Sequence, residues 1–260
     1  MINYALGVEY SGSAYCGWQR QKHSKSVQEE VENAIGFVAN HPVQLNCAGR
    51  TDSGVHAVEQ VASFQSDAER DERAWTLGSN CRLAKDIRLK WLKQVDSDFH
   101  ARFSAESRSY RYIILNTPVT SALFHDKVSW VYQPLDQDKM NESAQVLVGE
   151  HDFSAFRAVG CQSNSAVRNI HQIELTRREN VIYLDIKANA FLYHMVRNIA
   201  GSLIEVGKGS KNQSWISKLL AEGDRNKAAA TASAAGLYFV KAHYPERYNL
   251  PITVEKPVLF

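Results

Sequence analysis

The residues best suited to do chemistry gather in one short segment, CAGRTDSGVHA, at residues 47–57. This segment holds the carboxylate of Asp52, with Arg50 two residues before it and His56 four residues after it. Gly49 and Gly54 flank Arg50 and Asp52, and a glycine lets the backbone approach a substrate closely. A carboxylate held in such a loop can act as a nucleophile or as a base. One interpretation of the segment is therefore a catalytic loop with Asp52 as the reactive group.

The same segment is also typical of an ordinary turn. An aspartate in a turn accepts hydrogen bonds from its own backbone, and Gly54 can adopt the positive φ that many turns need. A histidine at the start of a strand, as His56 is here, is more often structural than catalytic. The local sequence leaves both interpretations open. A catalytic carboxylate further needs a positive neighbour and a site that excludes water, so the other motifs decide between them.

Two arginines could supply the positive charge beside Asp52. Arg50 lies in the same segment, whereas Arg197 lies in FLYHMVRNIAG, beside the apolar stripe of a predicted helix. The alternative for Arg197 is an ordinary exposed arginine on a helix surface, because arginines are mostly exposed in folded proteins. Arg197 is the more distant candidate in sequence, so only the tertiary fold could bring it to Asp52.

Two further segments mix arginines with aromatic rings, a combination that suits phosphates and stacked bases. The first is HARFSAESRSYRYIIL, which places Arg102, Arg108 and Arg111 among Phe103, Tyr110 and Tyr112. The second is YCGWQRQ, in which Trp18, Arg20 and Lys22 could contact RNA. The alternative is a strand with one aromatic core face and one solvated basic face. Tyr110 and Tyr112 share a strand face, so we expect at least one of them in the core.

Composition narrows the class of protein. The chain has 260 residues, 44% of them hydrophobic, which is enough for one large domain or two small ones. Thirty basic residues against 28 acidic ones give a net charge of only +2, so nucleic-acid binding would need local basic clusters. The four cysteines show no C-x-x-C spacing, and we expect no metal site. With no signal-peptide pattern and no apolar membrane span, the sequence predicts a cytoplasmic protein.

The elements that must position these residues follow from the hydrophobic spacing. Period-two alternation predicts strands, and apolar residues at i, i+3 and i+4 predict helices. The expected strands cover 2–10, 43–48, 58–66, 87–91, 107–116, 127–133, 167–178, 180–188 and 236–244, and the expected helices cover 27–38, 71–80, 140–148, 192–203 and 215–220. Strands and helices mixed in this order predict an α+β fold of two similar halves, residues 1–104 and 105–260.

Six blocks together resemble the tRNA pseudouridine synthase A family. They are YSGSAYCGWQRQ, CAGRTDSGVHA, FHARFSAESRSYRYII, GEHDFSAF, FLYHMVRNIAGSL and GLYFVKAHYP, and they occur in the family's order over residues 10–245. The resemblance implies two α+β subdomains that share a mostly antiparallel sheet, with helices on one face and a central catalytic cleft. It also implies a homodimer that binds tRNA and converts uridine to pseudouridine at positions 38 to 40 of the anticodon stem-loop, without a cofactor.

The resemblance also assigns roles to individual residues. It makes Asp52 the catalytic residue, with Tyr110 stacked on the target base, Arg197 paired with Asp52, and Arg50 helping to hold the flipped nucleotide. Possible tRNA contacts are Arg20, Arg102 and Arg108. The sequence departs from the family pattern at Ser11, where YDG is usual, and at Ser233, where a proline is common. These departures affect local loop shape and leave the proposed chemistry in place.

Three questions stay open at the level of sequence. Asp52 could attack C1′ of the ribose, or it could remove a sugar proton and pass through a glycal. A hydrolytic nucleosidase is a rival enzyme, although no second acidic residue shares the loop context of Asp52. A non-catalytic RNA-binding module is the rival from another class, because sheets with aromatics and arginines also bind RNA without chemistry.

Overall fold

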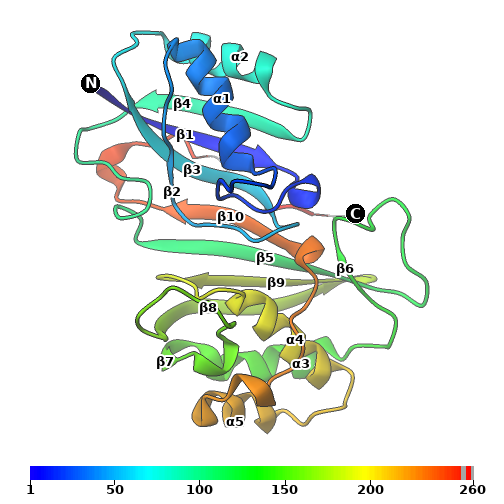
Figure 1. The fold of residues 1–260 in the computed structure, drawn as a ribbon. Helices are drawn as coiled ribbons and strands as arrows, with labels where there is room; N and C mark the ends of the chain where they lie inside the picture. The colour runs from blue at the N-terminus through cyan, green and yellow to red at the C-terminus, as the bar shows by residue number, and fades with distance from the viewer. Residues whose placement is uncertain (253–255, 259–260) are drawn as a thin grey trace. The chain divides into compact units, whose positions relative to one another are not determined.

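The structure is a computed structural model that describes residues 1–252 and 256–258. The chain forms two compact units (Figure 1). The first unit comprises Met1–Arg108 and Tyr238–Val258, and the second comprises Ser109–Leu237. No helix of the described residues is long and apolar enough to cross a membrane.

Four main strands build the first unit, in the order β4-β1-β3-β10. β1 (Ile2–Tyr10) pairs antiparallel with both β3 (His56–Ser66) and β4 (Ile87–Gln94). β10 (Leu237–His243) runs parallel to β3, and Tyr238 lies opposite His56. The alternating apolar residues of β1 explain why it is central, since its Leu6 and Val8 are fully buried.

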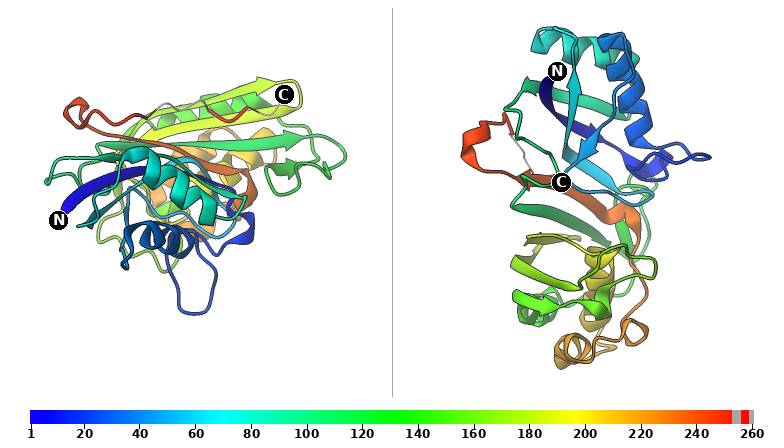
Figure 2. Two further views of the ribbon diagram at one scale, coloured as in Figure 1. Left: turned by 90° about the horizontal axis from the view of Figure 1, so that it is seen from above. Right: turned by 60° about the vertical axis from the view of Figure 1, so that its left-hand side comes forward.

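Helices α1 (Val27–Ala39) and α2 (Glu72–Arg82) lie on the same side of these strands (Figure 2). The capping box read from the sequence begins α1, because the Ser26 side chain accepts a hydrogen bond from the backbone N–H of Glu29. Trp75 of α2 is fully buried, and its ring lies 5.4 Å from Tyr4 and 5.6 Å from Phe64. This aromatic cluster fixes α2 on the sheet.

The second unit has the strand order β5-β9-β8-β7. These strands are β5 (Ser107–Asn116), β9 (Val181–Ala188), β8 (Val167–Arg178) and β7 (Gly149–Asp152), and the short β6 (Ser129–Val131) runs parallel to β5. β8 and β9 form the predicted hairpin, which turns at Glu179 with a φ of 49°. The α+β class and the mostly antiparallel pairing predicted from the sequence are confirmed.

Three α-helices complete the second unit as described: α3 (Gln137–Ala144), α4 (Met195–Gly207) and α5 (Ser214–Glu222). Side chains of α3 bind the backbone of β8, because Gln137 Nε2 donates to Leu175 O at 2.6 Å. α4 is apolar over most of its surface and lies in the core, as its buried Ile199 and Leu203 indicate. α4 also carries Arg197 at its first turn.

Several element boundaries differ from the expected ones. The strand expected at 43–48 is shortened to β2 (Asn46–Cys47), because side chains of α1 bind the backbone of Leu45. The Glu32 carboxylate accepts a hydrogen bond from the N–H of Leu45, and Gln28 Nε2 donates one to the carbonyl of Leu45. The helix expected to reach residue 148 ends at Ala144 and continues as one 3₁₀ turn to Leu147. The helix expected at 192–203 begins only at Met195, because His194 adopts a left-handed backbone that cannot continue a helix.

The division of the chain also differs from a single boundary at residue 104. The chain passes from the first unit to the second between Arg108 and Ser109, and it returns to the first at Tyr238. The physical reason is that the last strand belongs with the first unit. β10 pairs with β3, and the N–H of Glu106 donates to His243 O at 2.9 Å. The Tyr244 hydroxyl likewise donates to Ala101 O at 2.6 Å.

Candidate active site

Asp52 lies in a loop between β2 and β3 of the first unit, and this loop is fixed at both ends. At its start the N–H of Ala48 donates to Val61 O at 2.8 Å, and Gln60 Nε2 donates to Gly49 O at 2.5 Å. At its end the N–H of Val55 donates to Asp52 O at 3.1 Å and closes a tight turn. The Asp52 side chain is half-buried, so its carboxylate is sheltered yet reachable. The turn predicted from the sequence is therefore present, and the catalytic role of Asp52 stays a prediction.

The connection between β1 and α1 supports the Asp52 loop from the side. The Tyr10 hydroxyl and the Thr51 hydroxyl share a hydrogen bond of 2.7 Å, and the N–H of Trp18 donates to Thr51 O at 3.1 Å. The N–H of Gly54 donates to Tyr15 O at 3.3 Å. The blocks YSGSAYCGW and CAGRTDSGVHA, which are some forty residues apart in the sequence, therefore form one packed substructure.

The interpretation of Trp18 as an RNA contact is wrong. Its side chain is fully buried, and its ring packs against Tyr10 at a centroid distance of 5.8 Å. The tryptophan fills the space beneath the Asp52 loop, where its indole is inaccessible to a ligand. A buried aromatic residue of this size contributes to stability mainly through the apolar area it removes from water.

Two acidic groups near the loop, the Tyr10 hydroxyl and the Cys47 thiol, stay uncharged. Burial raises the pKa of the Tyr10 hydroxyl above its ordinary value, which keeps it neutral as a hydrogen-bonding partner of Thr51. Burial likewise raises the pKa of the Cys47 thiol to about 11. Neither side chain therefore adds a negative charge near the carboxylate of Asp52 at neutral pH.

His56, which the sequence left without a function, has a structural one. Its Nδ1 accepts a hydrogen bond from the N–H of Gly12 at 3.1 Å, which places the proton of the neutral ring on Nε2. The ring also stacks on Tyr238 of β10, with centroids 4.7 Å apart. His56 thus joins three segments of the first unit: β3, the β1–α1 connection and β10.

The candidate arginines that lie in the first unit differ in their exposure and in their partners. Arg50 is exposed on the Asp52 loop. Arg20 is exposed but forms ion pairs with Glu29 at 3.2 Å and with Glu32 at 3.1 Å. Arg102 is exposed, with its guanidinium 5.4 Å from the centre of the Phe103 ring. Arg108 is half-buried and donates to backbone carbonyls, so its surroundings resemble those of a structural residue.

In the second unit, Tyr110 and Tyr112 of β5 both lie in the core, with exposed fractions of 7% and 0%. Phe191 meets the Tyr110 ring edge to face at 4.9 Å. The Tyr112 hydroxyl donates to Ser233 O at 2.8 Å. Tyr112 therefore has a fixed structural partner, and the edge-on contact with Phe191 orients the Tyr110 ring.

Arg197 lies in the first turn of α4 and is held against the segment that follows α5. Its Nε donates to Ala232 O at 2.9 Å, and the N–H of Ala232 donates back to Arg197 O at 3.2 Å. The turn before it contains His194, whose φ of 59° is unusual for a residue other than glycine. Backbone strain of this kind is often found at functional sites.

A buried network next to Arg197 was missed in the sequence. Asn198 is fully buried, and its Nδ2 donates to Phe156 O at 2.8 Å. Its Oδ1 accepts from the Thr231 hydroxyl at 2.7 Å and from Arg225 Nη2 at 3.1 Å. The sequence contained a sign of this network, because Asn198 lies on the apolar face of the predicted helix together with Met195. The network holds the segment that binds Arg197.

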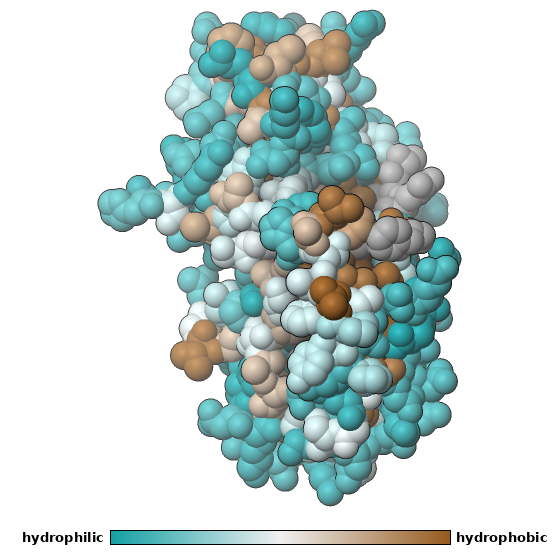
Figure 3. All heavy atoms as spheres, turned by 90° about the vertical axis from the view of Figure 1, so that its right-hand side faces the viewer, coloured by the Kyte–Doolittle hydropathy of each residue, from teal (hydrophilic) through white to brown (hydrophobic). Residues whose placement is uncertain are grey.

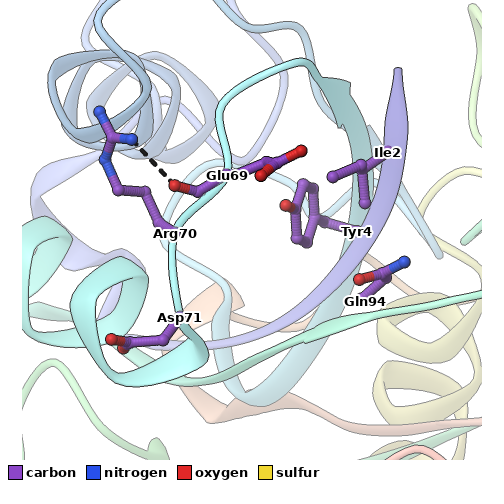
Figure 4. A pocket seen from close by; sticks show the side chains of 6 residues that line it. All are labelled: Ile2, Tyr4, Glu69, Arg70, Asp71 and Gln94. Atoms are coloured by element: carbon purple, nitrogen blue, oxygen red, sulfur yellow. Dashed lines mark hydrogen bonds between the residues drawn. The ribbon is translucent and has the colours of Figure 1, made fainter.

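The described residues contain no group of three or more histidine, cysteine, aspartate or glutamate side chains that could hold a metal ion. A pocket of about 500 Å³ opens in the first unit and is lined by Ile2, Tyr4, Glu69, Arg70, Asp71 and Gln94 (Figure 4). It lies at the start of β1, whereas the Asp52 loop lies at the end of β1. This pocket is therefore separate from the candidate site.

Comparison with known proteins gives the same family throughout. A family model described as tRNA pseudouridine synthase matches residues 7–104 and 143–245. A tRNA pseudouridine synthase A from Hydrogenovibrio crunogenus is 53% identical over 260 residues, which cover 100% of this chain and 99% of that protein. Proteins of the same name from Shewanella woodyi and Escherichia coli O1:K1 are 55% and 54% identical, over 96% and 95% of this chain and 96% and 92% of theirs.

Proposed function

The chain belongs to the tRNA pseudouridine synthase family, and from this membership we propose that it isomerises uridine to pseudouridine in the anticodon stem-loop of tRNA, at positions 38 to 40. One structural observation supports the proposal most directly. The half-buried carboxylate of Asp52 lies on a loop whose backbone is tied down on both sides. Such a preorganised carboxylate suits chemistry at a sugar carbon.

The proposed reaction breaks the N1–C1′ bond of uridine, turns the uracil and forms a C5–C1′ bond, while C5 loses a proton and N1 gains one. Atoms and electrons balance without an oxidant or a reductant, so we expect no cofactor. Asp52 takes part either by attacking C1′ or by removing a proton from the sugar. Both routes need an ionised carboxylate, and we propose Asp52 for this role in either case.

The other residues of the site are proposed from the family resemblance. Tyr110 stacks on the target base after the nucleotide has left the helix, because no base atom can be reached inside a stacked stem. Arg197 pairs with Asp52 and keeps it ionised, and Arg50 holds the flipped nucleotide. The network at Ala232 supports this role for Arg197, since it fixes one nitrogen of the guanidinium.

We further propose that the protein binds tRNA as a homodimer. The segment between β5 and β6 exposes Val119 and Leu123 at 75% and 82%, and Tyr132 after β6 at 58%. Figure 3 shows one face on which apolar side chains stand among hydrophilic ones. Exposed apolar groups of this kind support packing against a second copy. Light scattering tests the proposal, and a fully active monomer at micromolar concentration would contradict it.

The cytoplasmic location expected from the sequence stays a prediction.

Nucleoside analysis of tRNA after incubation with the purified protein tests the activity. We expect pseudouridine at positions 38 to 40 with a chelator present, because the proposed reaction uses a carboxylate and no metal. Anticodon stem-loops with a single uridine at 38, 39 or 40 would show which positions react. Release of free uracil would favour a hydrolase, and tight binding with unchanged uridines would favour an RNA-binding module.

A further inference from the structure

Arg108 contacts the start of the Asp52 loop, and its guanidinium donates hydrogen bonds to carbonyl oxygens of two separate segments. Nε and Nη2 both donate to Ala48 O, at 3.2 and 3.1 Å. Nη2 also donates to Arg102 O at 2.6 Å, and Nη1 donates to Ala105 O at 3.1 Å. One side chain of β5 thus joins the residue before the loop to the turn that precedes β5.

The surroundings of this guanidinium favour a structural use of its charge. Ala48 is only 2% exposed, so little water can replace Arg108 at its carbonyl. Burial raises the pKa of the nearby Tyr244 hydroxyl, and the charge of Arg108 opposes that rise. Hydrogen bonds from a charged donor to a buried carbonyl are stronger than those between neutral groups at a surface. Loss of Arg108 would leave the buried carbonyl of Ala48 without this donor.

The contact between Arg108 and Ala48 affects Asp52, because Ala48 lies at the start of the Asp52 loop. Ala48 is bound at its N–H by Val61 and at its carbonyl by Arg108, and Gly49 is bound by Gln60. Only three residues, 49 to 51, separate Ala48 from Asp52. A shift of the carbonyl of Ala48 therefore displaces the reactive carboxylate.

We propose that Arg108 is a positioning residue, which sets the place of the Asp52 carboxylate by holding the carbonyl of Ala48. This role rests on the proposed function and deepens it. It differs from a phosphate contact in one testable way. A lysine can replace an arginine at a phosphate, but its single ammonium lacks the planar fork that joins three carbonyls.

The experiment compares the wild type with Arg108→Lys, and with Arg108→Gln as a second variant should the first fold poorly. Arg88→Lys is the matched control, because Arg88 also donates to two backbone carbonyls, those of Ala84 and Ile87, away from the loop. Three quantities are measured: the single-turnover rate with saturating enzyme, the tRNA Kd as a function of salt, and amide hydrogen exchange in residues 46–57.

We expect the single-turnover rate of Arg108→Lys to fall about 10- to 100-fold, as misplacement by a fraction of an ångström to 1 Å can cause. Its Kd should stay within about twofold of the wild type with an unchanged salt slope, since no phosphate contact is lost. Exchange should speed up in residues 46–57. Arg88→Lys should match the wild type in all three measurements.

Two results would overturn the proposal. In one, Arg108→Lys keeps the wild-type rate and the wild-type exchange in residues 46–57. In the other, Arg108→Gln weakens binding and lowers the salt slope while the rate at saturation stays unchanged, which would indicate a phosphate contact. A wild-type protein that forms no pseudouridine would instead count against the proposed function, and the exchange comparison would still decide whether Arg108 holds the loop.

Discussion

The backbone of Gly17 lies so close to Thr51 that a Cβ added to Gly17 would come within 2.5 Å of the Thr51 carbonyl oxygen. Gly17 also has a φ of +87°, a conformation that residues with side chains rarely adopt. This close approach is what lets the N–H of the next residue, Trp18, donate to Thr51 O. A glycine outside the block CAGRTDSGVHA therefore helps to fix the residue before Asp52.

Gly17→Ala should displace the Asp52 loop and lower the rate of pseudouridine formation, with a loss of roughly 1–3 kcal/mol in stability. Gly209→Ala is the matched control, because Gly209 also has a positive φ of +76° but an added Cβ there meets no atom within 4 Å. The control should lose stability through backbone strain alone and keep its activity. Equal activity losses in the two variants would argue against a specific effect on the loop.

Asp52→Asn should abolish activity while the fold and tRNA affinity remain. Asparagine keeps the shape and the turn-forming capacity of the side chain but lacks the charge. We expect a rate loss of at least about 10²- to 10⁴-fold in an assay of pseudouridine formation. Asp67→Asn serves as control, since Asp67 is an exposed residue paired with the N-terminus. Turnover by Asp52→Asn, after mass spectrometry has excluded deamidation, would disprove the catalytic assignment.

Asn198→Ala should destabilise the protein by about 2–4 kcal/mol, because it leaves the buried carbonyl of Phe156 and the donors of Thr231 and Arg225 without this partner. Urea denaturation measures the loss. Asn226→Ala, at an exposed position, should cost less than about 0.5 kcal/mol. A similar small effect for both variants would mean that water replaces the buried asparagine.

Glu59→Gln should change how stability depends on pH. Glu59 is fully buried on β3, and burial raises its pKa despite Lys90 Nζ at 3.1 Å and the positive charge of Lys241. A raised carboxyl pKa means that the folded state binds the proton more tightly than the unfolded state. The stability due to this group is thus present at low pH and is lost as pH rises from the unfolded pKa, about 4.3, through the folded pKa.

Denaturation midpoints of the wild type and Glu59→Gln between pH 4 and pH 8 check this sign. The stability of the wild type relative to the variant should fall as pH increases across that window. A relative stability that instead rises with pH would show that the ion pair with Lys90 outweighs the cost of burial.

The sequence by itself determined most of the secondary structure and selected Asp52 as the candidate reactive group. Periodicity placed β5 and β8 at their observed bounds and the start of α1 at its capping box, because these features depend on neighbours within a few residues. The six blocks indicated the family that the comparisons then showed, and they selected Asp52 over the ordinary turn as the interpretation to test.

Only the tertiary structure decided what surrounds these residues. Trp18 was a candidate RNA contact by composition, and it is buried because the β1–α1 connection folds over the Asp52 loop. Arg108 looked like a surface cation, yet its guanidinium binds the carbonyl of Ala48, 60 residues earlier in the chain. The alternation of residues along a strand indicates which face of the strand is apolar. It does not indicate which distant carbonyl oxygen will require a hydrogen-bond donor, because that requirement arises only when the folded chain excludes water from the carbonyl.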